Sequence, residues 1–296
     1  MDIGEQVANA FERSLASDKY CDGKKRDPKP WKSRINEWGT YKDCSGARLY
    51  RNMEKDTDKK QGYLGGPTPF IAKPGVTGYR WSFDNLSSTH FPVQAHHLIP
   101  KNHLPGHPVC TFLAKGYTKS KKYQLAADTF YDTDHANNGY CLPYATPLVE
   151  WRSADGDDNL KLTIAFEVME ITNRQLHQGS HRAAAYEAPV DDDEEARIHA
   201  NGYLDTVDNL LRRVQNSAQA HMDSCSICKP DSGKKTVQPL ESLVQHMDQV
   251  SGIIKSLIDA NRIFISKPAS LWWSDRLKKL ALPKWMKGNQ PKSPTR

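Results

Sequence analysis

The stretch Phe91-Pro92-Val93-Gln94-Ala95-His96-His97-Leu98-Ile99-Pro100 places two adjacent histidines at the end of an apolar run. The run from Phe91 to Ala95 predicts a strand, and Pro100 marks the end of regular strand pairing. Successive side chains of a strand point to opposite faces, so an ordinary pleat would separate the two imidazoles. If both serve one site, the backbone has to turn there. One imidazole could then hold a metal ion while the other accepts a proton; a hydrogen-bonded histidine pair in a loop is the alternative.

Two later segments carry further candidate site residues. His135-Ala136-Asn137-Asn138-Gly139-Tyr140-Cys141-Leu142-Pro143 predicts a polar turn, with Asn-Gly suited to positive φ, and then a short apolar run. His177-Gln178-Gly179-Ser180-His181 holds two histidines four residues apart, a spacing that puts both imidazoles on one face of a helix. Because Gly179 weakens a helix, an exposed loop with two idle histidines is the alternative.

Taken in this order, the segments resemble the AHH family of the His-Asn-His/endonuclease VII (ββα-metal) nuclease superfamily, which is found among bacterial polymorphic toxins. The resemblance covers about Thr89 to Val214, somewhat less than half of the chain. Asn138 and His177 are farther apart than in compact family members. The matching residues are Ala95-His96-His97-Leu98-Ile99-Pro100, Asn138-Gly139-Tyr140-Cys141-Leu142-Pro143, His177-x-Gly-x-His181, and a helix with Tyr203, Val207, Leu210 and Leu211.

The resemblance implies a role for each matching polar residue. His97 would be the general base that deprotonates the attacking water, and His96 would be the first metal ligand. Asn138 would brace the loop that carries the base. His177 and His181 would be the later ligands, with His135 as an alternative. A divalent ion (Mg, Mn, Ni or Zn) would neutralise the negative charge that develops on the phosphate, and a neutral imidazole is available near pH 7 to accept the water's proton.

The charge balance favours a polyanionic partner. The formal net charge is +6, which is compatible with nucleic-acid binding without requiring it. Four lysines close in sequence to the proposed site would suit phosphate contacts, and solvated loop lysines are the alternative. They are Lys101, Lys119, Lys121 and Lys122. We therefore expect nucleic acid, DNA in particular, as the substrate.

The apolar residues, 38% of the chain, suffice for a core. The pattern predicts a mainly α-helical α+β protein with a small ββα-metal core inside helical elaborations. We expect a helical, loop-rich region over 1–75 that could dock a secretion carrier, a nuclease domain over 76–222, and a C-terminal helical region with a basic tail over 223–296. Apolar spacing predicts helices over 2–17, 109–115, 123–130, 194–222 and 240–264, a helix or strand over 160–171, and a strand over 78–83.

The six cysteines do not form a disulfide scaffold in a chain of 296 residues. Cys225-Ser226-Ile227-Cys228 has metal-knuckle spacing, and His221 lies four residues earlier. A structural zinc would need one more ligand, and free thiols or a local disulfide are the alternatives.

The sequence shows no N-terminal signal and no apolar run long enough to span a bilayer. We therefore expect a soluble protein made in the cytoplasm, exported by a machine that ignores signal peptides if it leaves the cell. The AHH resemblance predicts a metal-dependent endonuclease that acts as an antibacterial toxin. Such a toxin would be delivered by a specialised route such as type VI secretion and blocked by a cognate immunity protein. The alternatives are a non-toxic HNH-type nuclease of phage defence or DNA processing, and a zinc-stabilised binding module without catalysis.

Overall fold

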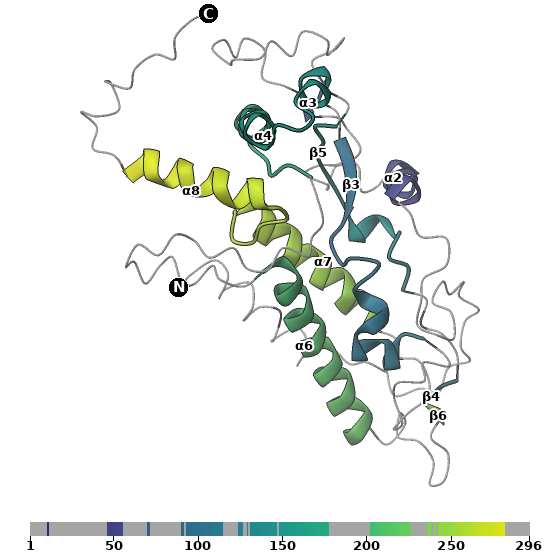
Figure 1. The fold of residues 1–296 in the computed structure, drawn as a ribbon. Coiled ribbons are helices and arrows are strands. Elements are labelled where there is room, and N and C mark those ends of the chain that lie inside the picture. The colour runs from purple at the N-terminus through teal and green to yellow at the C-terminus, as the bar shows by residue number, and fades with distance from the viewer. Residues whose placement is uncertain are drawn as a thin grey trace, which may run out of the picture.

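The computed structural model describes residues 11, 46–55, 70–71, 90–91, 93–114, 124–126, 129, 131–146, 148–177, 202–225, 236–237, 240 and 242–281. Within these ranges helices predominate and the strands are short, so the described part of the chain is mainly helical α+β (Figure 1). The predicted helix over 2–17 lies outside the described residues except for Phe11, which is helical and buried. The strand expected over 78–83 lies wholly outside them.

A two-stranded antiparallel ribbon carries the adjacent histidines. Strand β3 (Val93–His97) pairs with β5 (Gly139–Pro143), and every residue of β5 is buried. The strand predicted over 91–95 is confirmed, with its boundaries shifted toward the C-terminus. The cross-strand partners are Val93 and Pro143, Gln94 and Leu142, Ala95 and Cys141, His96 and Tyr140, and His97 and Gly139.

The backbone does not turn between the two histidines. Strand β3 stays regular through His97, and the chain bends only afterwards, where the Leu98 amide donates a hydrogen bond to the Asn138 carbonyl (2.9 Å). The pleat therefore directs His96 and His97 to opposite faces of the ribbon. The turn required for both imidazoles to serve one face is absent from the ribbon.

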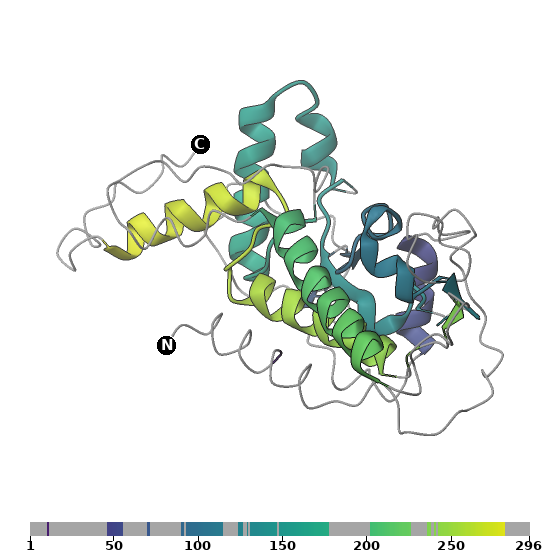
Figure 2. The ribbon, with the colours of Figure 1, turned by 90° about the horizontal axis from the view of Figure 1, so that it is seen from below.

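Two long helices form the main core on the His96 side of the ribbon. Helix α6 (Tyr203–Ser224) packs along α7 (Leu243–Asp259), and Figure 2 shows the two lying side by side. Their buried apolar residues recur at three- and four-residue intervals, as the sequence predicted for the segments 194–222 and 240–264. The second prediction is too long, because α7 ends at Asp259 and residues 260–264 are not helical. One buried cluster joins both helices, so segments on either side of the expected boundary at residue 222 share a core.

A second cluster joins helices α3 (Val149–Ser153), α4 (Asp158–Thr172) and α8 (Lys267–Ala281). The segment 160–171, predicted as helix or strand, is a helix whose N-terminus is capped by Asp157, which accepts a hydrogen bond from the Leu160 amide (2.9 Å). Trp272 is 1% exposed within this cluster. The first part of the expected basic tail is therefore a packed helix.

Helix α2 (Gly46–Lys55) covers the other face of the ribbon and buries Leu49 and Met53 against it. A Cβ atom on Gly139 would lie 2.8 Å from Met53 Cγ and 3.1 Å from Leu49 Cδ1, so glycine permits this close approach. The sequence predicted a positive φ at the glycine of Asn138-Gly139. This prediction is wrong, because Gly139 has φ −102° and begins β5. None of the helices in the described ranges is long and apolar enough to cross a membrane.

Short secondary structure completes the described fold. Strand β1 (Phe70–Ile71) pairs antiparallel with β2 (His90–Phe91), and β4 (Gln124–Leu125) pairs parallel with β6 (Thr236–Val237). The helix predicted over 123–130 is thus wrong at residues 124–125, because pairing with a distant strand overrides the local pattern. The helix predicted over 109–115 is a 3-10 helix, η2 (Pro108–Phe112).

Candidate active site

The two adjacent histidines have different partners on the two faces of the ribbon. His96 is 1% exposed, and its Nε2 lies 2.8 Å from the Tyr203 hydroxyl on α6. His97 has a side chain that is 12% exposed, and its Nε2 lies 2.8 Å from Asp134 Oδ1. The pleat therefore separates the two imidazoles, as expected of a regular strand, and the backbone turn that a shared face would require is absent.

His177, predicted as a ligand from far along the chain, meets His96. Their ring centroids are 5.1 Å apart, with the ring planes at 68°. The His177 amide donates to the Pro143 carbonyl (2.8 Å), which fixes this residue at the end of β5. His177 Nδ1 lies 2.6 Å from Gln94 Oε1, and Gln94 shares the His96 face of β3 because the two residues are two positions apart. We call these two imidazoles the His96–His177 pair.

Hydrogen bonds fix the tautomer of each member of this pair. The Tyr203 hydroxyl has one proton and donates it to the Leu98 carbonyl (2.6 Å), so it accepts from His96, which carries its proton on Nε2. Burial raises the pKa of Tyr203 well above its usual value, which keeps the phenol protonated. Gln94 Oε1 only accepts, so His177 carries its proton on Nδ1. The ring nitrogens with a lone pair are then Nδ1 of His96 and Nε2 of His177.

This arrangement fits a divalent metal ion in its donor chemistry. Metal-binding histidines generally donate one ring N–H to a positioning group and ligate through the other nitrogen. Two imidazoles on one tetrahedral ion have ring centres about 5 Å apart, given metal–nitrogen bonds of about 2.0–2.1 Å. Among the described residues, no group of three or more His, Cys, Asp or Glu side chains could hold a metal ion. His181, the remaining predicted ligand, lies outside the described residues.

Asp134 is a candidate site residue that the sequence did not reveal. It is fully buried, its amide donates to Asp132 Oδ1 (3.0 Å), and its carbonyl accepts from Asn52 Nδ2 (2.8 Å) on α2. Its carboxylate accepts from His97 Nε2, which leaves the lone pair of His97 on Nδ1. A carboxylate that orients an imidazole in this way is typical of histidine general bases. The only sequence signal was an acidic residue shortly before Asn138.

Asn138 holds together the loop after His97. Its side chain is fully buried, accepts from the Ile99 amide (2.7 Å) and the Ser251 hydroxyl (2.9 Å), and donates to the carbonyls of Ile99 (3.0 Å) and Thr133 (2.9 Å). These bonds connect the bend after β3, the turn before β5 and helix α7. They are the contacts that a loop-bracing asparagine would make.

The other predicted site residues are not gathered around the His96–His177 pair in the described part of the chain. Lys101 is half-buried in the turn after β3, and Lys119, Lys121 and Lys122 lie outside the described residues. His135 has a side chain that is 47% exposed and lies 3.9 Å from Asp248 of α7. Cys225 is half-buried at the end of α6, and Cys228 lies outside the described residues.

Comparisons with known proteins give no relative to set beside this geometry. No protein-family model, no curated protein and no solved structure matches the chain. The likeness to the AHH nucleases therefore stays a prediction from the motif residues.

Proposed function

We propose that the chain is a metal-dependent endonuclease that hydrolyses phosphodiester bonds, with DNA as the expected substrate. The observation that supports this most is the His96–His177 pair, in which residues 81 positions apart face each other with tautomers suited to metal binding. A purely structural histidine pair needs no such matched orientation. We also propose that the β3–β5 ribbon and helix α6 correspond to the ββα-metal core.

Each residue then has a distinct task. His96 and His177 would hold the ion, with His181 as the third protein ligand. The ion, when bound, supplies positive charge at the phosphate oxygens and the leaving oxygen. His97 accepts the proton of the attacking water at Nδ1, and Asp134 stabilises the imidazolium that forms.

The opposite directions of His96 and His97 constrain the substrate. A phosphate that lay flat over the His96 face could not reach the His97 ring, which projects toward α2. The scissile phosphate must therefore lie across the end of β3, where His97 is the last residue of the strand. This end is also where the loop braced by Asn138 begins.

Plasmid cleavage tests the proposal. The protein is stripped of metal with a chelator, and Mg, Mn, Ni and Zn are added back separately to supercoiled DNA and, in parallel, to RNA. We expect His96→Ala and His177→Ala to lose both metal affinity and cleavage, whereas His97→Ala loses cleavage and keeps metal affinity. His135→Ala is the matched control, because it removes an exposed imidazole bound to α7.

Two results would contradict the proposal. A protein that binds these metals but cleaves neither DNA nor RNA is not a nuclease, and the zinc-stabilised binding module then describes it better. Cleavage by His97→Ala at the wild-type rate would remove His97 as the base and leave the metal pair intact.

We further propose, from the AHH resemblance, that the activity serves as an antibacterial toxin carried into rival cells by a specialised secretion system. A cognate immunity protein would then protect the producer, and the net charge of +6 suits an acidic inhibitor. Expression of the wild-type chain in a bacterial cytoplasm should stop growth, while His96→Ala should not. Equal growth of both strains, with active enzyme recovered from the cells, favours the non-toxic nuclease instead.

A further inference from the structure

Gln94 links strand β3 to the candidate metal pair. It is half-buried two positions before His96, so both side chains lie on the same face of the ribbon. Its Oε1 lies 2.6 Å from Nδ1 of His177, which is 83 positions farther along the chain. An amide oxygen can only accept a hydrogen bond, so the contact requires the imidazole to carry its proton on Nδ1.

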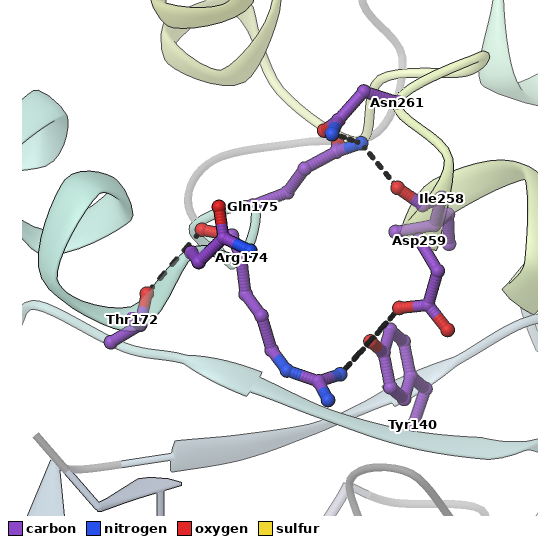
Figure 3. A pocket seen from close by; sticks show the side chains of 8 residues that line it. Tyr140, Thr172, Arg174, Gln175, Ile258, Asp259 and Asn261 are labelled. Carbon is purple, nitrogen blue, oxygen red and sulfur yellow. Dashed lines mark hydrogen bonds and ion pairs between the residues drawn. The ribbon is translucent and has the colours of Figure 1, made fainter. Parts of the chain in front are cut away.

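The backbone of His177 is held by contacts that do not involve Gln94. The His177 amide donates to the Pro143 carbonyl (2.8 Å) at the end of β5. Two residues earlier, the Gln175 side chain is 1% exposed and donates to the Ile258 carbonyl (3.0 Å), a contact with the end of α7 that Figure 3 shows. Because these bonds fix the backbone, the freedom that Gln94 removes is rotation of the imidazole ring and movement of its proton between the two nitrogens.

The position of this proton decides which nitrogen of His177 can bind an ion. A neutral imidazole in water carries its proton more often on Nε2, which leaves the lone pair on Nδ1. With that tautomer, Nδ1 and the Gln94 oxygen would be two acceptors in contact, and no lone pair would face away from Gln94. The observed contact favours the opposite tautomer. It leaves the lone pair on Nε2, and the ring that carries it is 5.1 Å from the ring of His96.

The supporting group of His177 is also uncharged. Metal-binding histidines generally donate their second N–H to a carboxylate, a carbonyl or water, and the Gln94 amide is a carbonyl acceptor. Asp134, by contrast, sets a carboxylate against His97, where an imidazolium would form. An amide behind His177 orients the ring and adds no negative charge, so the charge of a bound ion stays available to phosphate oxygens.

We propose that Gln94 is a positioning residue of the candidate metal centre. It holds His177 in the tautomer with the proton on Nδ1 and makes Nε2 the ligating atom. This assignment rests on the proposed metal-dependent function, whereas the tautomer itself is a property of the metal-free protein. The two can therefore be measured separately.

Nitrogen NMR of the imidazole rings tests the tautomer in isotope-labelled, metal-free protein. Chelator is present, and the pH is held well above about 6.5, where the neutral imidazole predominates. The His177 signals are assigned by their loss in His177→Ala. We expect the His177 proton on Nδ1 in the wild type. Gln94→Met, which keeps the length of the side chain and removes the acceptor, should shift the proton to Nε2.

Two further variants control this measurement. Gln94→Glu keeps an acceptor and should retain the proton of His177 on Nδ1. Gln219→Met is the matched control, because it removes an amide that is bound to Asp223 on α6, and it should leave the tautomer unchanged.

Competition with a chromophoric chelator for Zn or Ni tests the role of Gln94 in metal binding. Gln94→Met should weaken the affinity about 10–100-fold, the typical effect of losing a group that orients a ligating imidazole. Gln94→Glu should bind at least as tightly as the wild type. If the amide instead donated to His177, a carboxylate could not replace it, and Gln94→Glu would bind as weakly as Gln94→Met. That result would overturn the assignment.

Failure of the positioning role can be told apart from failure of the proposed function. A wild-type protein with the His177 proton on Nε2 would overturn the proposal without any variant, so the test remains decisive if thermal melting shows that Gln94→Met does not fold. Equal metal affinity of the wild type and a folded Gln94→Met would also overturn it, even if the protein cuts plasmid. The expected shift of the tautomer in a protein that binds none of the metals would support Gln94 as the group that orients His177 and refute only the metal-dependent function.

Discussion

Replacement of Tyr203 by phenylalanine removes one hydroxyl and tests the candidate metal pair through its support. The hydroxyl contacts His96 Nε2 (2.8 Å) and the Leu98 carbonyl (2.6 Å), and Tyr203 is 2% exposed. The substitution keeps the aromatic ring that packs between α6 and the ribbon. Its consequences therefore arise from the lost hydrogen bonds and not from a large cavity.

Two separate free energies should change. The His96 N–H and the Leu98 carbonyl each lose a buried partner, and an unsatisfied buried group costs about 1–3 kcal/mol, so the free energy of unfolding should fall by about 2–6 kcal/mol. Loss of the group that orients a ligating imidazole typically weakens metal affinity about 10–100-fold. That factor corresponds to about 1.4–2.8 kcal/mol of binding free energy.

Urea unfolding near neutral pH measures the first quantity, and competition with a chromophoric chelator for Zn or Ni measures the second. Tyr131→Phe is the matched control, because Tyr131 is 1% exposed in the same core cluster but belongs to another segment. It should leave metal affinity unchanged whatever it does to stability. If Tyr203→Phe lowers stability by the expected amount yet binds metal as tightly as the wild type, His96 is not a ligand and the proposed centre is wrong.

Three further substitutions test other parts of the structure. Burial lowers the pKa of His107 from 6.5 to about 4. The unfolded chain therefore takes up this proton first as the pH falls. The free energy of unfolding should fall by roughly 3 kcal/mol as the pH is lowered from 6.5 to about 4. His107→Asn keeps an acceptor for the Val109 amide. The free energy of unfolding of this variant, measured with urea, should depend less on pH than that of the wild type. An equal pH dependence of the two proteins would contradict this. Asn138→Ala should lower the free energy of unfolding by about 3 kcal/mol, since several buried backbone groups lose their partner; a loss below about 1 kcal/mol would show that the loop is braced otherwise. Gly139→Ala should cost about 1–3 kcal/mol in the same assay, because its Cβ overlaps Met53. The same substitution should cost little when it is made in a Met53→Ala background, and an unchanged cost in that background would refute this cause.

Parts of the fold that depend on neighbouring residues were predictable from the sequence. Helix α6 buries Val207, Leu211 and Val214, whose spacing puts them on one face whatever surrounds the helix. The strand through His96 was also predictable from local sequence, because apolar β-branched and aromatic residues precede a proline there. The proximity of His177 to His96 was expected from the resemblance to the AHH family and not from the local pattern, and the two rings are in contact.

Parts that depend on distant residues were not predictable. Residues 124–125 form a strand only because they pair with residues 236–237, more than a hundred positions away. Asp134 is one acidic residue among many until folding brings it to His97 across 37 positions. Gly139 looked like a turn glycine because the local sequence cannot show that Met53 approaches it.

The direction of the two adjacent imidazoles follows from the strand itself and constrains any mechanism. Adjacent residues on a regular strand point to opposite faces of the sheet. A centre that used both His96 and His97 from the same side would therefore require β3 to be broken before His97. The register through His97 and Gly139 shows that β3 is unbroken. Each imidazole has instead been given its own support, Tyr203 for His96 and Asp134 for His97. If this chain cuts nucleic acid, the metal ion and the base therefore act from opposite faces of β3. The substrate must then pass around the end of the strand to reach both.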